Sequence, residues 1–138
     1  MYINILNSRI KKYFLDALRE NGINMTPEQY LVMDILWDKQ SISQQQIADI
    51  IKKDKNSVTK FIDSLEKNNL VKRTVDKSDR RVNKIELTPQ GLSLRQTSTE
   101  LGINFMTKTI EGITDKDLET FVGVLQKITE NLEGEGNK

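Results

Sequence analysis

The fold is decided by residues 54–91, which read DKNSVTKFIDSLEKNNLVKRTVDKSDRRVNKIELTPQG. The first part of this stretch carries apolar residues at the spacing of one helix face, namely Val58, Phe61, Ile62 and Leu65. Asp54 stands at the expected N-cap, and Asn68-Asn69 follows the apolar stripe, where asparagine tolerates the left-handed conformation of a helix end. The sequence therefore predicts a capped amphipathic helix between Asp54 and Asn68.

The second part of the stretch predicts a short β-hairpin. Residues 70–75 and 84–87 have the composition and alternation of strands, and residues 76–82 between them are polar and turn-like. Thr88-Pro89 then opens another helix. A helix followed at once by a basic hairpin is a recurring way to hold duplex DNA, because a helix fits the major groove and a cationic tip suits phosphates and the minor groove.

Further helices are predicted on both sides of this stretch. Residues 3–20 have a helical apolar period that ends before Gly22. Two capping boxes, Thr26 to Gln29 and Ser43 to Gln46, each begin a helix. The second of these helices is joined by a short turn to the helix after Asp54, so the pair forms a helix-turn-helix.

The C-terminal part predicts a helix with an unusually narrow apolar seam. Thr114 begins this helix, and its apolar residues are spaced by threes and fours: Leu118, Phe121, Leu125, Ile128 and Leu132. Residues 134–138 are expected to fray. The low hydrophobic content of 36% for a chain with several long helices indicates that a second copy completes part of the apolar surface.

Composition restricts the function further. The 138 residues suit one domain, or one domain with a helical appendage, and they include no cysteine and no histidine. Thiol chemistry is therefore excluded, and the commonest general base and metal ligand is absent. We expect no membrane span, no signal peptide, no metal site, no cofactor and a cytoplasmic location. Residues 51–84 carry eleven basic and five acidic side chains, so the positive charge gathers on the segment that resembles a nucleic-acid reader.

The predicted DNA-binding residues lie at the starts of the two helices of the helix-turn-helix. The recognition helix would read bases through Lys55, Asn56, Ser57, Thr59 and Lys60. Asn pairs with adenine, Lys donates to guanine, and the Thr methyl contacts thymine. Gln44 and Gln45 would contact phosphates. The alternative interpretation is a capped surface helix with ordinary solubilising residues.

The predicted hairpin tip carries a second set of DNA-binding residues. Arg80 and Arg81 are placed to enter a narrow minor groove, and Asp76 or Asp79 would hold an arginine in place through a bidentate pair. The alternative is a set of exposed ion pairs of little energetic value.

These segments together resemble the MarR family of bacterial winged-helix regulators, over about half the chain by motif. The matching segments are MTPEQYLVMDIL (25–36), SISQQQIADII (41–51), DKNSVTKFIDSLEKNNLVKR (54–73), DKSDRR (76–81) and LTPQG (87–91). The resemblance places the base-reading residues on the family's recognition helix and Arg80 on its wing arginine. Asn69 stands where the family commonly has Gly, and it suits the same backbone conformation.

The resemblance implies a mainly α fold with a small β-hairpin wing. Residues 25–91 would form a winged helix-turn-helix DNA-binding lobe, and residues 1–24 and 92–138 a helical dimerisation region. It also implies a homodimer that binds a pseudo-palindromic operator in double-stranded DNA, usually as a repressor released by a small ligand. Candidates for lining the effector cleft are Tyr13, Tyr30, Met33 and Trp37, although each also suits the core.

Two other function classes fit the sequence less well. Ser57 to Lys60 matches an S-x-x-K nucleophile pattern, but the supporting elements of that enzyme class are absent and the chain is too small. Residues 115–119 lack the glycine and the terminal glutamate of a calcium loop. A winged helix used for protein contacts, or an antirepressor without DNA binding, would have little need for Lys60, Arg80 and Arg81 together.

Overall fold

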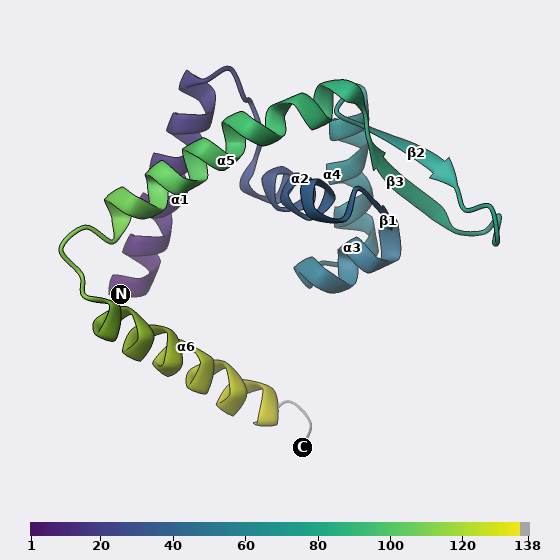
Figure 1. Cartoon of the computed structure of the whole chain (residues 1–138). Coiled ribbons are helices and arrows are strands. Elements are labelled where there is room, and N and C mark those ends of the chain that lie inside the picture. The colour runs from purple at the N-terminus through teal and green to yellow at the C-terminus, as the bar shows by residue number, and fades with distance from the viewer. Residues whose placement is uncertain (136–138) are drawn as a thin grey trace. The chain divides into compact units, whose positions relative to one another are not determined.

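The computed structural model describes residues 1–135, which form helices and one small sheet (Figure 1). The elements in chain order are α1 (Tyr2–Glu20), α2 (Pro27–Lys39), β1 (Ser41–Ser43), α3 (Gln44–Ile51), α4 (Lys55–Lys67), β2 (Val71–Val75), β3 (Asn83–Leu87), α5 (Pro89–Thr109) and α6 (Asp115–Glu135). The chain divides into two compact units, one spanning Met1–Ile103 and the other running from Asn104 to the end. Within residues 1–135 no helix combines the length and the apolar character needed to cross a membrane.

The predicted helix starts are confirmed by their hydrogen bonds. The Thr26 hydroxyl accepts from the backbone N–H of Gln29, whose side chain accepts from the Thr26 N–H in return. Ser43 and Gln46 make the same reciprocal pair at the start of α3. At the start of α4, a carboxylate oxygen of Asp54 accepts from the Ser57 N–H at 2.9 Å. Each cap satisfies backbone donors that have no partner inside the helix.

The helix ends agree with the sequence at two positions and differ at two others. Gly22 and Asn69 both have positive φ, at +77° and +58°, as expected of residues that follow a helix. Gln40 and Lys52 also have positive φ, at +66° and +53°. These two conformations were not predicted, because neither Gln nor Lys favours that region.

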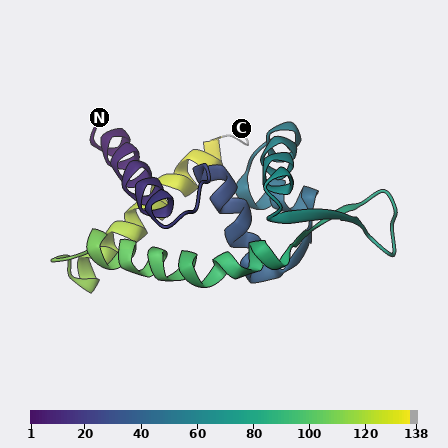
Figure 2. The same ribbon diagram turned by 90° about the horizontal axis from the view of Figure 1, so that it is seen from above.

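The sheet contains one strand that the sequence did not predict. Its order is β1-β3-β2, with both neighbouring pairs antiparallel. The three residues of β1 are too few to show an alternation, and β1 forms because Ile42 pairs with Ile85 over the core. The β2–β3 hairpin extends well beyond the helices of the first unit and forms the predicted wing (Figure 2).

The core of the first unit holds α4 by its apolar stripe. Val58, Ile62 and Leu65 are fully buried, whereas Phe61 is only partly buried. They pack in one cluster with Leu18 of α1 and with residues of α2, α3 and the sheet. Burial of one face of α4 leaves the opposite face turned outward.

The LTPQG segment closes the base of the wing. The Thr88 hydroxyl donates to the Asn69 carbonyl at 2.6 Å and accepts from the Gly91 N–H at 3.0 Å. The Trp37 indole N–H donates to the Gly91 carbonyl at 3.0 Å. A Cβ at Gly91 would lie 2.0 Å from the Leu70 carbonyl oxygen, so only glycine permits this approach. The segment therefore ties α5 to α2 and to the start of β2.

The second unit contains the end of α5 and the whole of α6. Gly112 has a φ of +78° in the turn between them, and the Thr114 hydroxyl accepts from the Asp117 N–H at 3.2 Å at the predicted helix start. The seam residues Phe121, Leu125, Ile128 and Leu132 are 54%, 41%, 47% and 67% exposed. The helix continues to Glu135, so the expected fraying is wrong for residues 134 and 135, while 136–138 lie outside the described residues.

Candidate nucleic-acid interface

The predicted base-reading residues of α4 fall into two groups in the structure. Lys55, Asn56 and Lys60 are exposed on the outward face of the helix. Ser57 is half-buried, and its hydroxyl donates to the Asp54 carboxylate at 2.6 Å, so this side chain takes part in the helix cap. The Asp54 carboxyl has a lowered pKa, first because it accepts from the Ser57 hydroxyl and then from the Ser57 backbone N–H.

Thr59 connects α4 to α3. Its hydroxyl donates to the Lys55 carbonyl at 2.9 Å and accepts from the Gln44 side-chain amide at 2.6 Å. Gln45, also in the first turn of α3, donates instead to the Asp49 carboxylate at 2.9 Å. The structure thus brings Gln44 against the recognition helix and leaves Gln45 on the exposed side of α3.

Asp76 organises the turn of the wing. Its carboxylate accepts from the Ser78 N–H at 2.7 Å, from the Ser78 hydroxyl and from the Asp79 N–H at 3.2 Å. The Lys84 ammonium lies 3.1 Å from the second carboxylate oxygen. These contacts hold the pKa of Asp76 far below its ordinary value, with the Ser78 hydroxyl as the largest cause. The carboxylate therefore acts as an anionic centre around which the turn folds.

Asp79 holds Arg81 through both carboxylate oxygens. The Arg81 Nε and Nη2 atoms lie 3.1 and 3.2 Å from Oδ1 and Oδ2, and the Arg81 backbone N–H donates to Oδ1 at 3.0 Å. The hydrogen bonds from Arg81 lower the pKa of Asp79. The Arg81 side chain is 90% exposed, so the pair orients a guanidinium that faces solvent. Arg80 is also exposed.

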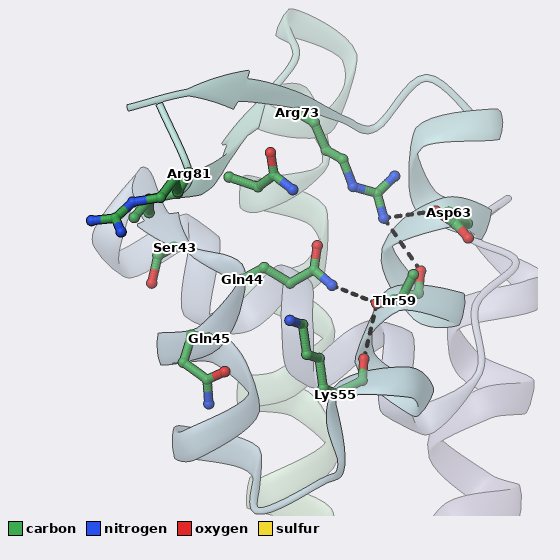
Figure 3. A pocket seen from close by; sticks show the side chains of 10 residues that line it. Ser43, Gln44, Gln45, Lys55, Thr59, Asp63, Arg73 and Arg81 are labelled. Atoms are coloured by element: carbon green, nitrogen blue, oxygen red, sulfur yellow. Dashed lines mark hydrogen bonds and ion pairs between the residues drawn. The ribbon is translucent and has the colours of Figure 1, made fainter. Parts of the chain in front are cut away.

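An open pocket of about 400 Å³ joins the recognition helix to the wing (Figure 3). Its lining comes from the end of β1, from α3 and α4, and from the hairpin: Ser43, Gln44, Gln45, Lys55, Thr59, Asp63, Arg73, Arg81, Val82 and Asn83. Five of the predicted site residues therefore meet on one concave surface. Asn56, Ser57, Lys60 and Arg80 do not line the pocket.

Arg73 also lines this pocket, although the sequence did not single it out. Its guanidinium contacts Asp63 and Glu66 of α4, with Nη2–Oδ1 at 2.6 Å and Nη1–Oε1 at 3.0 Å. The sequence could have indicated this role, because the strand alternation puts Arg73 on the same face of β2 as Val71 and Val75. A charged residue on that face needs a partner, and Asp63 and Glu66 were available one helix away.

The four candidates for an effector cleft lie in different environments. Met33 and Trp37 are core residues at 0% and 5% exposure. Tyr30 stacks edge-on between Phe14 and Trp37, with ring centroids at 4.8 and 5.8 Å. Burial, followed by the nearby Asp34 charge, raises the pKa of Tyr30. Tyr13 is 44% exposed. The structure described for residues 1–135 contains no group of three acidic, His or Cys side chains able to hold a metal ion.

Comparison with known proteins places this arrangement among related regulators. The MarR family model matches residues 25–82. The chain is 31% identical over 130 residues to the HTH-type transcriptional regulator PrsX of Escherichia coli. This alignment covers 92% of this chain and 76% of PrsX.

Two solved structures share the fold. A MepR–DNA complex from S. aureus has a TM-score of 0.86 at 20% identity and covers 94% of this chain and 95% of that one. A mutant MarR from E. coli complexed with operator DNA has a TM-score of 0.83 at 19% identity and covers 92% and 90%. From the likeness to PrsX, the match of the family model and the winged-helix geometry, the chain belongs to the MarR family of winged-helix transcriptional regulators.

Proposed function

We propose that the protein binds a pseudo-palindromic operator in double-stranded DNA as a homodimer and represses transcription until a small ligand releases it. The observation that carries the proposal is the exposed face of α4 with Lys55, Asn56 and Lys60, set beside a wing whose Arg81 is oriented by Asp79. This face lies within the most basic part of the chain. Such a surface is complementary to a major groove and its flanking phosphates.

Each part of this surface has a separate role in the proposal. The exposed residues of α4 read base edges, where Asn56 pairs with adenine and Lys60 donates to guanine. Arg81 enters the adjacent minor groove with Asp79 fixing its direction, and Arg80 contributes positive charge beside it. Gln44 and Gln45 contact phosphates from the first turn of α3, and Ser57 and Thr59 support the helix from its half-buried side.

The proposed dimer rests on apolar residues that this single chain leaves exposed. In α6 these are Phe121, Leu125, Ile128 and Leu132, and at the start of the chain they are Met1 and the α1 residues Tyr2, Ile3, Ile5 and Leu6. Several large apolar side chains exposed along one helix are typical of a protein interface. We place the dimerisation region in residues 1–24 and 92–138 and the DNA-binding lobe in residues 25–91.

The proposed ligand would be recognised by aromatic side chains of α1 and α2. Tyr13 and Tyr30 remain candidates for contact with the ligand, whereas Met33 and Trp37 would support the proposed effector cleft from the core. We propose a non-covalent organic ligand, because the chain has no cysteine for oxidation and no histidine for a transition metal. We expect no catalytic activity, and a chromosomal DNA partner requires a cytoplasmic location.

Selection of bound sequences from a random DNA pool tests the function directly. The expected result is an inverted repeat whose half-site centres lie about one helical turn apart. A gel shift on the selected site should then show affinity that falls steeply with salt, with a slope near −0.9 for each phosphate contact. Recovery of no common sequence, together with salt-insensitive binding, would contradict the proposal.

A further inference from the structure

One guanidinium connects the wing to three positions of the recognition helix. Arg73 Nη2 lies 2.6 Å from Asp63 Oδ1 and 3.4 Å from the Thr59 carbonyl oxygen, and Nη1 lies 3.0 Å from Glu66 Oε1. The Arg73 backbone N–H also donates to Glu66 Oε2 at 3.1 Å. Residues 59, 63 and 66 follow the spacing of one helix face, so a single side chain contacts two turns of α4. Figure 3 shows the contacts of Arg73 with Thr59 and Asp63.

The arrangement restricts how α4 can rotate relative to β2. A planar guanidinium with fixed donor directions satisfies three acceptors only when the helix has one orientation. The Arg73 side chain is 23% exposed, in contrast to the 58% of Lys72 beside it, which makes an ion pair with Glu86. A half-buried guanidinium bound to several acceptors restricts the orientation of its partners more than an exposed ion pair does.

The same contacts reach the start of α3. Thr59, whose carbonyl accepts from Arg73, also accepts from Gln44 through its hydroxyl at 2.6 Å. The hydrogen bonds therefore run from β2 through α4 to α3 without a break. Each of these three elements contributes residues to the lining of the pocket between the recognition helix and the wing.

We propose that Arg73 is a positioning residue that sets sequence specificity by fixing the rotation of α4 relative to the wing. It acts through Thr59, Asp63 and Glu66, which determine where the exposed residues of α4 meet the base edges. The proposal rests on the proposed DNA-binding function. A helix that rotates by a fraction of a turn still lies in a positively charged surface, so general DNA affinity is retained while base discrimination is lost.

Two variants distinguish the positioning role of Arg73 from an effect of its positive charge. Arg73→Lys keeps the positive charge but removes the planar fork. The double variant Arg73→Gln/Glu66→Gln removes one positive and one negative charge, so the net charge of the Arg73, Asp63 and Glu66 cluster stays the same while the clamp is lost. Arg19→Lys is the matched control, because it makes the same substitution in an exposed pair with Asp16 at 3.7 Å on α1.

The measurement is the ratio of affinities for the selected operator and for its single-base variants, together with the salt slope on random DNA. Wild-type protein and Arg19→Lys should prefer the operator by roughly 5- to 150-fold over a single-base variant. In both Arg73 variants, the ratio of operator affinity to single-base-variant affinity should fall to about threefold or less. The salt slope on random DNA should stay equal to that of the wild type. A loss of stability alone lowers the active fraction equally for every DNA and leaves the ratio unchanged.

The possible results distinguish a failure of the proposed DNA-binding function from a failure of the proposed positioning role of Arg73. Wild-type protein that selects no sequence overturns both. Wild-type selection with an unchanged ratio in Arg73→Lys, or in the charge-matched double variant, overturns the positioning role alone. A salt slope reduced by about 0.9 per protomer in the double variant would identify Arg73 as a direct phosphate contact instead. Failure of both variants to fold would make Arg73 a stability residue and would likewise overturn the inference.

Discussion

At the scale of single residues, two kinds of side chain define the wing and its base. Gly91 and Asn69 supply backbone geometry, the first by its lack of a Cβ against Leu70 and the second by its positive φ. Asp76 and Asp79 supply charge at fixed positions, the first folding the turn and the second orienting Arg81. The wing is therefore shaped by local hydrogen bonds, whereas its base depends on close packing.

Gly91→Ala should destabilise the first unit. The added Cβ would lie 2.0 Å from the Leu70 carbonyl oxygen, and this backbone atom can move only by shifting the wing from α5. We expect a loss of about 1–3 kcal/mol in the free energy of unfolding, measured by urea denaturation. Gly102→Ala is the control in the same helix, since nothing lies within 4 Å of a Cβ there, and it should be neutral or slightly stabilising. Equal stability of the two variants would show that the close approach at Gly91 is not maintained.

Asp76→Asn should remove a pH-dependent part of the stability. Because the pKa of Asp76 is lower in the folded protein than in the unfolded chain, its contribution is fully present above about pH 4 and is lost as the pH falls further. Wild type should therefore be more stable than Asp76→Asn at pH 7, and the difference should narrow in acid. Urea midpoints for both proteins across pH 2–7 would test this, and a difference independent of pH would contradict it.

At the scale of elements, α4 and the wing carry different side chains on the surface that we propose contacts DNA. α4 offers exposed Asn56 and Lys60, which suit base edges, while the wing offers guanidinium groups on a narrow hairpin. α4 is held by its buried stripe and by Arg73, whereas the tip of the wing is held by Asp76 and Asp79.

Substitutions in these two elements should change DNA binding in different ways. Lys60→Ala should cost about 1–3 kcal/mol on the best site and relax the preference at particular base positions. Arg81→Ala should weaken binding more evenly across sequences, with some loss of A·T preference beside the half-site. Because Asp79 orients Arg81, we expect Arg80→Ala to have the smaller effect of the two wing variants. Competition binding against a set of operator variants measures all three. A Lys60→Ala protein with unchanged affinity and preference would exclude α4 as the reader.

At the scale of the whole molecule, the first unit buries its apolar residues within itself, whereas the second unit leaves apolar residues exposed. The first unit buries a cluster that includes residues from α1 to β3. The second unit exposes the apolar seam of α6, which a single copy of the chain leaves open to solvent. We propose that a second copy of the chain covers this surface.

Leu125→Lys should weaken the proposed dimer. Leu125 is 41% exposed in the single chain, and a charge there would be buried without a partner in a dimer interface. Sedimentation at micromolar concentration should show monomer, and operator affinity should fall with a reduced salt slope because fewer phosphates are contacted. Gln126→Lys adds the same charge to the adjacent exposed position and should remain dimeric. A Leu125→Lys protein that is still a dimer with full affinity would place the interface elsewhere.

The sequence by itself determined the features that depend on short-range chemistry. The helix starts at Thr26, Ser43 and Asp54 follow from caps that bond within three residues, and the helix end at Asn69 follows from its own backbone preference. The apolar period predicted which face of α4 is buried. The family followed from the DKSDRR and LTPQG segments, whose residues act close to one another in the chain.

Only the tertiary structure decided the features that depend on residues far apart in the chain. β1 exists because Ile42 meets Ile85, and nothing local distinguishes its three residues from a loop. Thr59 serves as a link between helices because Gln44 reaches it from α3. The role of Arg73 emerges only when β2 is placed against α4, since a side chain's partners are set by distance in space and not by position in the sequence.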